Sequence, residues 1–501
     1  MPTYSIWMIA LWRMITLLFM PLVLLLSGVA GVLVAPTPTH AAAAYIGEYS
    51  PNTRIEMRGD TIWFVRPPYE SRMLPTTDGV YIFEAGWLAG RAAKFVNNER
   101  GGVSILLRAD DGNWNEFARS GEIYTDLDPS LRAALAHTVE DQIRLRGLPG
   151  AVLYVYIDGQ GEYIVARGVA DRGQGIPAVP LDRWRVASVS KTFLAVTVLR
   201  LFDQGILRLD DSVEQWLPGV VPNGANITIR HLLNHQSGLY NYMDNYFIGL
   251  VMSNPYRVWS PYELINYSNL YAPHFAPGTP GRWRYSNTNY VLLGLIVEQA
   301  TGQSLAQAMR THLLDPLGLS NTRFEPDEVY PGKMRGYLGW RDISDFNLSY
   351  AWGCGSIESN AADLGVFMRA LMHGELLSPF ATQEMLRFVS VGGEWNSRFL
   401  TYGLGVMRDR MSIAHDISGN PRPDELGYVI GHTGALGGYR SALWYQPQRG
   451  ITIAVGVNQM YTDANFIATA VLDTIYAYQE RTGTISVPAE GAIVALPAAG
   501  Q

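Results

Sequence analysis

The stretch WRVASVSKTFLAV (residues 184–196) places a serine and a lysine three positions apart, just ahead of an apolar run. Residues three apart on a helix share a face, so Ser188 and Lys191 are predicted to lie together at the start of a helix that ends near residues 203–205. A serine hydroxyl is a weak nucleophile until a neighbouring base takes its proton, and a desolvated lysine can act as that base. On its own the pattern also fits an N-cap serine and a surface lysine.

The lysine is unusual for this chain. The sequence has 38 Lys plus Arg, and only three of them are lysines, Lys94, Lys191 and Lys333. Arginine stays protonated in proteins, whereas a buried lysine can release its proton. Position 191 is therefore a place where the ability of lysine to lose a proton is expected to matter.

The composition fits a large globular protein and excludes several classes. The 501 residues are 48% hydrophobic, with a net charge of -7 and no basic stripe, so no nucleic-acid partner is expected. A single cysteine, Cys354, excludes internal disulfides and cysteine-based metal clusters, and it is expected to be a buried small residue. The nine histidines are few and scattered for a chain of this length, so we expect neither a metal nor an organic cofactor.

The N-terminus resembles a targeting segment. Residues 14–34 form an uncharged run of 21 residues, long enough to span a bilayer, and the small residues 41–44 resemble a signal-peptidase site. Residues 1–43 are therefore predicted to be a signal peptide or a retained membrane anchor, with a buried core helix as the third interpretation. Both main interpretations predict an extracytoplasmic protein, either secreted or attached through residues 14–34 to the outer face of the cytoplasmic membrane.

A small β region is predicted to follow. Residues 45–122 contain short aromatic or β-branched runs separated by turns rich in Gly, Asp and Asn. This spacing predicts a small antiparallel barrel or sandwich. It has no cluster of titratable groups, so we interpret it as an accessory all-β domain.

The main domain is predicted to be α+β and to cover residues 127–482. It opens with a helix capped by Asp128, and hairpins are expected over residues 151–167 and 439–457. One antiparallel sheet built from both ends of the domain, flanked by helices and interrupted by a mainly helical subdomain, accounts for this order. Residues 487–501 are rich in Ala, Gly and Pro and are expected to form a flexible tail.

Several motifs, in order, resemble one family. The nucleophile segment is similar to that of the serine β-lactamase and penicillin-binding superfamily, most closely the branch of class C β-lactamases, D-Ala-D-Ala carboxypeptidases and related esterases. The resemblance extends over about residues 127–480. The other segments that carry it are GLPGAVLYVYIDGQGEYIVARGVAD (147–171), DQGILRLDDSVEQWLP (203–218), ITIRHLLNHQSGL (227–239), FAPGTPGRWRYSNTNYVLLGLIVEQATGQSL (275–305) and GHTGALGGYRSALWYQPQRGITIAVGVN (431–458).

The resemblance assigns the second motif to Tyr285 and Asn287. A second Tyr-Ser-Asn, beginning at Tyr267, lies outside the family's context, so we interpret Tyr267 as structural. A lysine beside a tyrosine favours the phenolate, which could take the proton of Ser188 and pass it to the leaving group. Asn287 is expected to hold Lys191 and a substrate carbonyl through its amide.

The third motif departs from the lactamases. Class C enzymes have Lys-Thr-Gly where this chain has His432, Thr433 and Gly434, as in D-Ala-D-Ala carboxypeptidases and esterases of the family. The resemblance implies that these residues bind or orient the substrate. His432 could donate a hydrogen bond to a substrate carboxylate or to Tyr285, or it could be a satisfied core histidine. Replacement of the lysine argues against efficient β-lactam hydrolysis.

The resemblance also implies an oxyanion hole and a mechanism. Gly434 would let the strand edge approach the substrate, and the N–H groups of Ser188 and Ala435 would hold the oxyanion. Ser188 would form an acyl-enzyme, with Lys191 and Tyr285 as the base system.

The expected substrate is small: a peptidoglycan peptide, an ester or a β-lactam. D-Ala-D-Ala carboxypeptidase-like or other amide or ester hydrolysis is the main prediction. The alternatives are a carboxylesterase or β-lactamase using the same site, and a non-catalytic binding or sensor member of the fold. Loops near residues 240–275 and 325–350 are expected to set the substrate. Three further candidates are interpreted as structural: His235, Ser237 and Gly238.

Overall fold

The computed structural model describes most of the chain after the N-terminal segment. The predicted signal peptide or anchor over residues 1–43 lies outside the described residues, and within them every helix is too short or too polar to cross a membrane. The described residues are 47–50, 53–58, 61–66, 69–76, 80–84, 92–97, 103–108, 114–118, 122–325, 327–328, 333–396 and 398–493.

The predicted small all-β region is confirmed. Its described strands form one antiparallel sheet in chain order, and cross-strand neighbours Ile62, Met73 and Phe83 are buried on one face. Phe64 joins them, with its ring 5.2 Å from that of Phe83. The strands are β1 (Gly47–Ser50), β2 (Thr53–Arg58), β3 (Thr61–Arg66), β4 (Tyr69–Pro75), β5 (Val80–Phe83), β6 (Ala92–Asn97), β7 (Val103–Arg108) and β8 (Trp114–Ala118).

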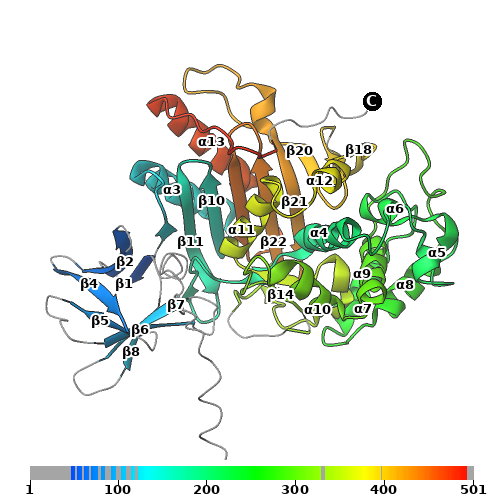
Figure 1. Ribbon diagram of the computed structural model, residues 1–501, viewed down its shortest axis with the longest axis horizontal. Coiled ribbons are helices and arrows are strands. Elements are labelled where there is room, and N and C mark those ends of the chain that lie inside the picture. Colours follow the sequence, from blue (N-terminus) through cyan, green and yellow to red (C-terminus); the bar gives the residue numbers. More distant parts are fainter. Residues whose placement is uncertain are drawn as a thin grey trace, which may run out of the picture. The chain divides into compact units, whose positions relative to one another are not determined.

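The main domain has the predicted antiparallel sheet, built from both ends of its sequence (Figure 1). The described strands follow the order β12-β11-β10-β23-β22-β21-β20-β19-β18, with β9 beside β11, and β10 pairs directly with β23. The bounds are β9 (Ile123–Tyr124), β10 (Gly150–Ile157), β11 (Gly161–Asp171), β12 (Ile176–Pro177), β18 (Val389–Ser390), β19 (Thr401–Tyr402), β20 (Met407–Arg410), β21 (Tyr428–Leu436), β22 (Tyr439–Gln446) and β23 (Ile451–Val457).

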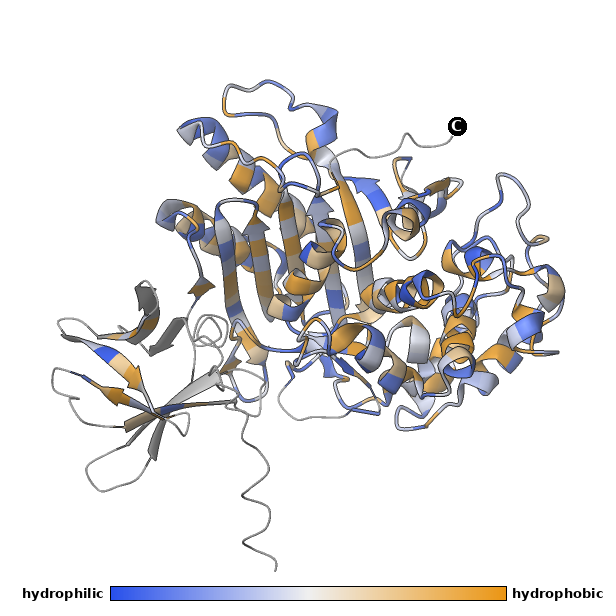
Figure 2. Cartoon of the chain, in the orientation of Figure 1, coloured by the Kyte–Doolittle hydropathy of each residue, from blue (hydrophilic) through white to orange (hydrophobic). Residues whose placement is uncertain are grey.

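Helices cover both faces of this sheet. Alternate residues of a strand point to opposite faces. Leu153 on β10 therefore packs with helices α3 (Pro129–Arg146) and α13 (Asn465–Thr482), whereas its neighbour Tyr154 packs with α11 (Ala361–Met372). Hydrophobic residues accordingly concentrate in the strands of the sheet and in the inner sides of these helices (Figure 2).

The first helix of the domain begins where the sequence predicts. The side chain of Asp128 accepts a hydrogen bond of 2.8 Å from the backbone N–H of Ser130, Pro129 is the first helical residue, and Gly147 ends the helix in the left-handed conformation. The predicted cap at Asp128 is therefore confirmed, and Pro129 and Gly147 suit the first helical position and the end of α3.

The middle of the domain is mainly helical, as predicted. The helices that follow the Ser-Lys segment are α4 (Ser190–Asp203), α5 (Val213–Trp216), α6 (Ile229–Leu233), α7 (Asn245–Ser253), α8 (Pro261–Asn269), α9 (Asn287–Thr301) and α10 (Leu305–Met309). The elements after them are β14 (Arg323–Phe324), β15 (Tyr337–Leu338), β16 (Arg341–Asp342), β17 (Ile357–Ser359) and α12 (Pro379–Met385).

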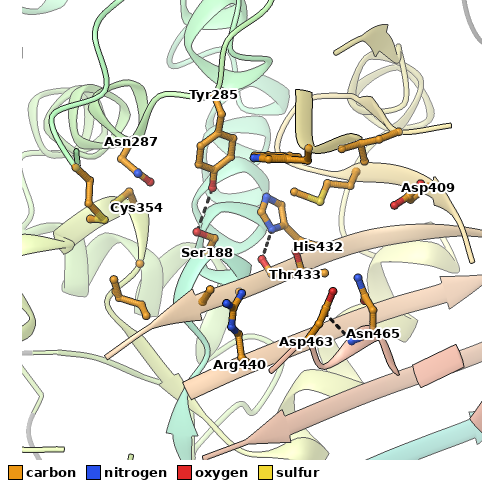
Figure 3. A pocket seen from close by; sticks show the side chains of 18 of the residues that line it. Ser188, Tyr285, Asn287, Cys354, Asp409, His432, Thr433, Arg440, Asp463 and Asn465 are labelled. Atoms are coloured by element: carbon orange, nitrogen blue, oxygen red, sulfur yellow. Dashed lines mark hydrogen bonds between the residues drawn. The ribbon is translucent and has the colours of Figure 1, made fainter. Parts of the chain in front are cut away.

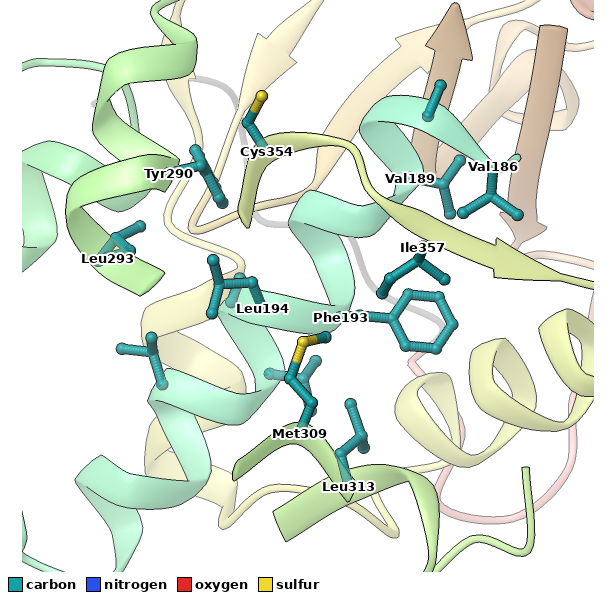
Figure 4. Packing of buried hydrophobic residues seen from close by; sticks show 14 of the residues in the cluster. Val186, Val189, Phe193, Leu194, Tyr290, Leu293, Met309, Leu313, Cys354 and Ile357 are labelled. Atoms are coloured by element: carbon teal, nitrogen blue, oxygen red, sulfur yellow. The ribbon is translucent and has the colours of Figure 1, made fainter. Parts of the chain in front are cut away.

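Helix α4 lies at the centre of the larger core cluster. Phe193 stacks on Phe367 of α11 with ring centroids 3.8 Å apart. Leu194, Met309 and Ile357 lie in the same cluster (Figure 4). Because the interior is close-packed around it, α4 gives its N-terminal residues a fixed position.

The chain from Val487 is attached further than expected. The N–H of Ala489 donates to Asp158, and the N–H of Ile493 donates to the carbonyl of Met372. Two backbone donors paired with the main domain hold this stretch in place, so the predicted flexible tail does not begin at Val487. The rest of the tail lies outside the described residues.

Candidate active site

Ser188 lies in a tight turn between a short strand and α4. Strand β13 (Trp184–Arg185) pairs with β17, and a 3₁₀ turn over Ala187–Val189 leads into α4. Ala187 has φ 54°, a left-handed conformation that is rare for a residue with a side chain. Such strain is often found at functional sites. The turn leaves the side chain of Ser188 partly exposed, at the wall of a cavity. Ser188 therefore lies at the start of α4, as the sequence predicts.

Lys191 is buried directly beneath the serine. Its side chain is fully buried, and Nζ donates to Ser188 Oγ at 3.0 Å and to the backbone carbonyl of Cys354 at 2.7 Å. Burial lowers the pKa of Lys191 to about 8, from an ordinary value of 10.5. A lysine with this pKa is partly neutral near neutral pH, so it can accept a proton from the adjacent hydroxyl.

Tyr285 reaches the same hydroxyl from the other side. Its phenol donates to Ser188 Oγ at 3.1 Å (Figure 3). Burial raises the pKa of Tyr285 well above its usual value. The expected phenolate is therefore wrong for the resting site, because desolvation disfavours the charged form. Lys191 is the more readily deprotonated of the two groups, and Tyr285 is a proton donor.

Asn287 lines the cavity but contacts a different partner from the one expected. Its backbone N–H and side-chain amide donate to Oδ1 of Asn241, at 3.0 and 3.1 Å. Lys191 uses the carbonyl of Cys354 in place of the predicted contact with Asn287. The Asn287 side chain thus faces the cavity fixed by a second asparagine, which sequence reasoning missed.

His432 is a buried, neutral histidine. Its Nδ1 lies 2.6 Å from the carbonyl of Thr433, which can only accept, so Nδ1 carries the proton. Its Nε2 then accepts from the hydroxyl of Tyr402 at 3.0 Å. Burial lowers the pKa of His432 to about 3. Both ring nitrogens are used, so the expected donation to Tyr285 or a substrate carboxylate is wrong for this arrangement, and the core-histidine alternative fits.

Strand β21 presses against the serine turn at Gly434. A Cβ at this position would lie 2.2 Å from the carbonyl oxygen of Val186 and 3.1 Å from the amide nitrogen of Ser188. Only glycine permits this approach. Ala435 follows on the same strand and lines the same cavity as Ser188, so the two residues predicted to form an oxyanion hole lie together.

The cavity above Ser188 has a volume of about 590 Å³. This is the size of a small-molecule site. The loop near residues 240–275 lines the cavity, as expected. The described residues of segment 325–350 do not line it, and residues near 395–409 and 463–465 line it instead. The residues that line it are Ser188, Asn241, Met243, Tyr285, Asn287, Cys354, Gly355, Trp395, Leu400, Met407, Asp409, His432, Thr433, Gly434, Ala435, Leu436, Arg440, Trp444, Asp463 and Asn465.

The remaining candidates have structural contacts. Tyr267 donates to the carboxylate of Asp244, and Ser237 donates to Asn289 in the core. Cys354 is buried, and burial raises the pKa of its thiol. Within the described residues, no three His, Cys, Asp or Glu side chains are grouped so as to hold a metal ion.

Ser188 contacts a buried lysine and a tyrosine, and it lies at the start of a helix beside the edge of a strand. This arrangement is that of a serine hydrolase site. Residues 135–476 match the family model described as Beta-lactamase, and the chain belongs to this family of serine hydrolases.

Relatives named for different activities are similar to this domain. The chain is 38% identical over 212 residues to Esterase EstB of Burkholderia gladioli, covering 40% of this chain and 53% of the esterase. It is 28% identical over 299 residues to Penicillin-binding protein 4* of Bacillus subtilis (strain 168), and the match covers 55% of this chain and 60% of that protein. The solved D-stereospecific amidohydrolase from Streptomyces sp. is 32% identical with a TM-score of 0.58, covering 70% of this chain and 99% of that one.

Proposed function

We propose that the protein hydrolyses amide bonds of small peptides or amides through an acyl-enzyme on Ser188, as D-Ala-D-Ala carboxypeptidases and D-specific amidases do. The observation that carries the proposal is the position of Ser188 Oγ, which accepts hydrogen bonds from both Lys191 and Tyr285 at the wall of a cavity of about 590 Å³. The similarity to a D-stereospecific amidohydrolase over 99% of that chain supports an amide as the substrate.

In the acylation step, neutral Lys191 takes the proton of Ser188 as Oγ bonds to the substrate carbonyl carbon. The tetrahedral oxyanion lies against the N–H groups of Ser188 and Ala435. The C–N bond then breaks, and the leaving nitrogen takes a proton from the phenol of Tyr285, which is restored by the proton held on Lys191. The result is an ester on Ser188 and a free amine.

In the deacylation step, a water molecule replaces the amine. Neutral Lys191 accepts the proton of the water as its oxygen bonds to the ester carbonyl carbon. The bond from that carbon to the Ser188 oxygen then breaks, the oxygen takes a proton from the phenol of Tyr285, and the proton held on Lys191 restores the phenol. The products are a carboxylic acid and the original serine. The same residues thus serve both halves of the reaction, which explains why all of them contact a single hydroxyl.

Ester hydrolysis is a second candidate, favoured by the 38% identity to Esterase EstB. An ester needs less help from a proton donor, because an alkoxide is a better leaving group than an amide anion. A site that cleaves esters only would therefore depend weakly on Tyr285, whereas amide cleavage would depend on it strongly.

The test uses the purified protein with four substrates: a peptide ending in D-Ala-D-Ala, D-phenylalanine amide with its L enantiomer as the matched control, a chromogenic short-chain ester, and a fluorescent penicillin. We expect D-selective amide turnover that is lost in Ser188→Ala. Turnover of the ester alone would replace the amidase with the esterase. No turnover and no covalent labelling, with Ser188→Ala identical to the wild type, would leave the non-catalytic binding alternative.

A further inference from the structure

His235 is a buried histidine that contacts the ring of Tyr285 and the backbone on both sides of it. The ring of His235 packs on the ring of Tyr285 with centroids 4.4 Å apart. Its Nδ1 accepts the N–H of Ser286 at 3.2 Å, and its backbone carbonyl accepts the N–H of Arg284 at 3.2 Å. One residue therefore holds the backbone on both sides of Tyr285 and also holds its ring.

His235 has two energetically unfavourable features in this position. It has φ 62°, in the left-handed region that a bulky side chain rarely adopts. Because Nδ1 accepts a hydrogen bond, the proton is on Nε2, and this buried atom has no hydrogen-bond partner among the described residues. Strained backbone and unsatisfied buried donors persist where the surrounding structure imposes them, and both are typical of functional sites.

Neighbouring aromatic rings prevent His235 from moving. The ring of Tyr402 meets it edge-on at 4.8 Å and that of Trp283 at 5.6 Å, and the residue has no exposed surface. Burial and the nearby Lys191 keep the pKa of His235 well below its usual value, so the ring is neutral. A neutral ring can pack against Tyr285 without adding charge next to Lys191.

We propose that His235 is a positioning residue, which sets the Tyr285 hydroxyl at hydrogen-bond distance from Ser188 by fixing the ring and the adjacent backbone of Tyr285. It acts through Tyr285 and does not itself line the cavity. The proposal rests on the proposed hydrolase function for its kinetic consequence. The geometric consequence, a displaced Tyr285 when His235 is replaced, does not depend on that function.

The experiment compares three variants. His235→Gly removes the ring and the Nδ1 acceptor and relieves the backbone strain. His235→Asn tolerates the left-handed conformation and can offer an amide oxygen to the N–H of Ser286. Ser237→Ala, two residues away, removes a buried hydrogen bond to Asn289, whose amide nitrogen lies 3.4 Å from His235 Nδ1. Ser237 has no contact with Tyr285 in the described residues, and the variant keeps His235, so it controls for loss of stability in the same segment.

We expect His235→Gly to lower kcat about 100-fold with KM changed less than about threefold, since small misplacements of a catalytic group have effects of this size. His235→Asn should recover part of the loss, and Ser237→Ala should lower Tm while leaving kcat within about threefold of the wild type. In crystals of His235→Gly, the distance from the Tyr285 hydroxyl to Ser188 Oγ should exceed about 3.5 Å, the limit of a hydrogen bond.

Each other outcome decides the matter. A Tyr285 hydroxyl that stays on Ser188 in His235→Gly, or a kcat loss equal to that of Ser237→Ala at equal Tm, would overturn the proposal. If His235→Gly does not fold, the same distance is measured in His235→Asn, which keeps an acceptor for the N–H of Ser286 but has no ring. A lengthened distance with a lowered kcat then supports the proposal, and a hydroxyl that stays on Ser188 with wild-type kcat overturns it. If the wild type turns over no substrate but Tyr285 moves in His235→Gly, the hydrolase proposal fails and the positioning role stands.

Discussion

Lys191 Nζ lies 3.0 Å from Ser188 Oγ in a fully buried position, with no carboxylate among its hydrogen-bond partners in the described part of the chain. A buried ammonium that is not paired with a negative charge loses its proton more easily, which is why the pKa of Lys191 falls to about 8. The base that the proposed reaction needs is thus available near neutral pH without help from a histidine or a metal.

The first prediction concerns the dependence of activity on pH. Only neutral Lys191 can accept the serine proton, so kcat/KM should rise with pH, about tenfold per pH unit below the pKa near 8 and level above it. Initial rates with the best substrate from pH 5 to 10 would measure this.

The pH profile can distinguish Lys191 from His432 as the base, because His432 is neutral over the pH range measured. Since burial lowers the pKa of His432 to about 3, no limb between pH 6 and 7 should come from it, and His432→Gln should leave the limb near pH 8 in place. A profile governed by a single group near pH 6.5, abolished in His432→Gln, would mean that the histidine and not the lysine is the base.

The second prediction is that Lys191→Met stabilises the protein while abolishing activity. A lysine with a lowered pKa in the folded state opposes folding wherever it is charged, and the penalty is complete below pH 8 and disappears above pH 10.5. The variant should therefore gain about 1–3 kcal/mol of unfolding free energy at pH 7, and much less at pH 10. Urea unfolding at both pH values measures the difference.

Lys333 is the matched control for this prediction. Its Nζ lies 2.6 Å from Glu325, so its charge is paired, and Lys333→Met should destabilise the fold because the buried carboxylate of Glu325 keeps Arg185 but loses its second cation. If both substitutions destabilise at pH 7 by similar amounts, Lys191 is not held in a strained charge state and the assignment of the base is incorrect.

Much of this site could be predicted from the sequence because local signals were strong. The spacing placed Ser188 and Lys191 at the start of a helix, and the structure shows them in contact. The motif context separated Tyr285 from Tyr267: the phenol of Tyr285 contacts Ser188, whereas that of Tyr267 contacts Asp244. The sheet was predictable because each strand carries its own pattern and the hairpins at both ends of the domain are short.

What failed depended on burial and on backbone atoms. The protonation states of Tyr285 and His432 follow from desolvation, and the sequence does not show how deeply a side chain is buried. The acceptor for Lys191 is the carbonyl of Cys354, and a carbonyl has no sequence signature because every residue has one. Asn241 could have been found only by placing its loop against Asn287.

The third prediction is that Tyr285→Phe lowers kcat for amides by about 10²–10⁴-fold, because it removes the proton donor to the leaving nitrogen. Tyr267→Phe is the matched control, since it removes a phenol of the same motif that contacts Asp244 instead. Steady-state kinetics with one amide and one ester of the same acyl group would measure both. An equal, small effect of the two substitutions on amide turnover would show that Tyr285 does not supply the proton.

The fourth prediction concerns the close approach of β21 to the serine turn. In Gly434→Ala the new Cβ would lie 2.2 Å from the carbonyl oxygen of Val186, so the strand or the turn must shift. We expect a loss of about 100-fold or more in kcat, because the shift separates the Ser188 and Ala435 amides from the oxyanion, and a loss of about 1–3 kcal/mol of unfolding free energy. Gly249→Ala on α7 is the control: its Cβ meets nothing within 4 Å, so it should leave kcat unchanged and raise stability slightly. The assignment of the oxyanion hole to this strand would be wrong if Gly434→Ala lost stability but kept its kcat.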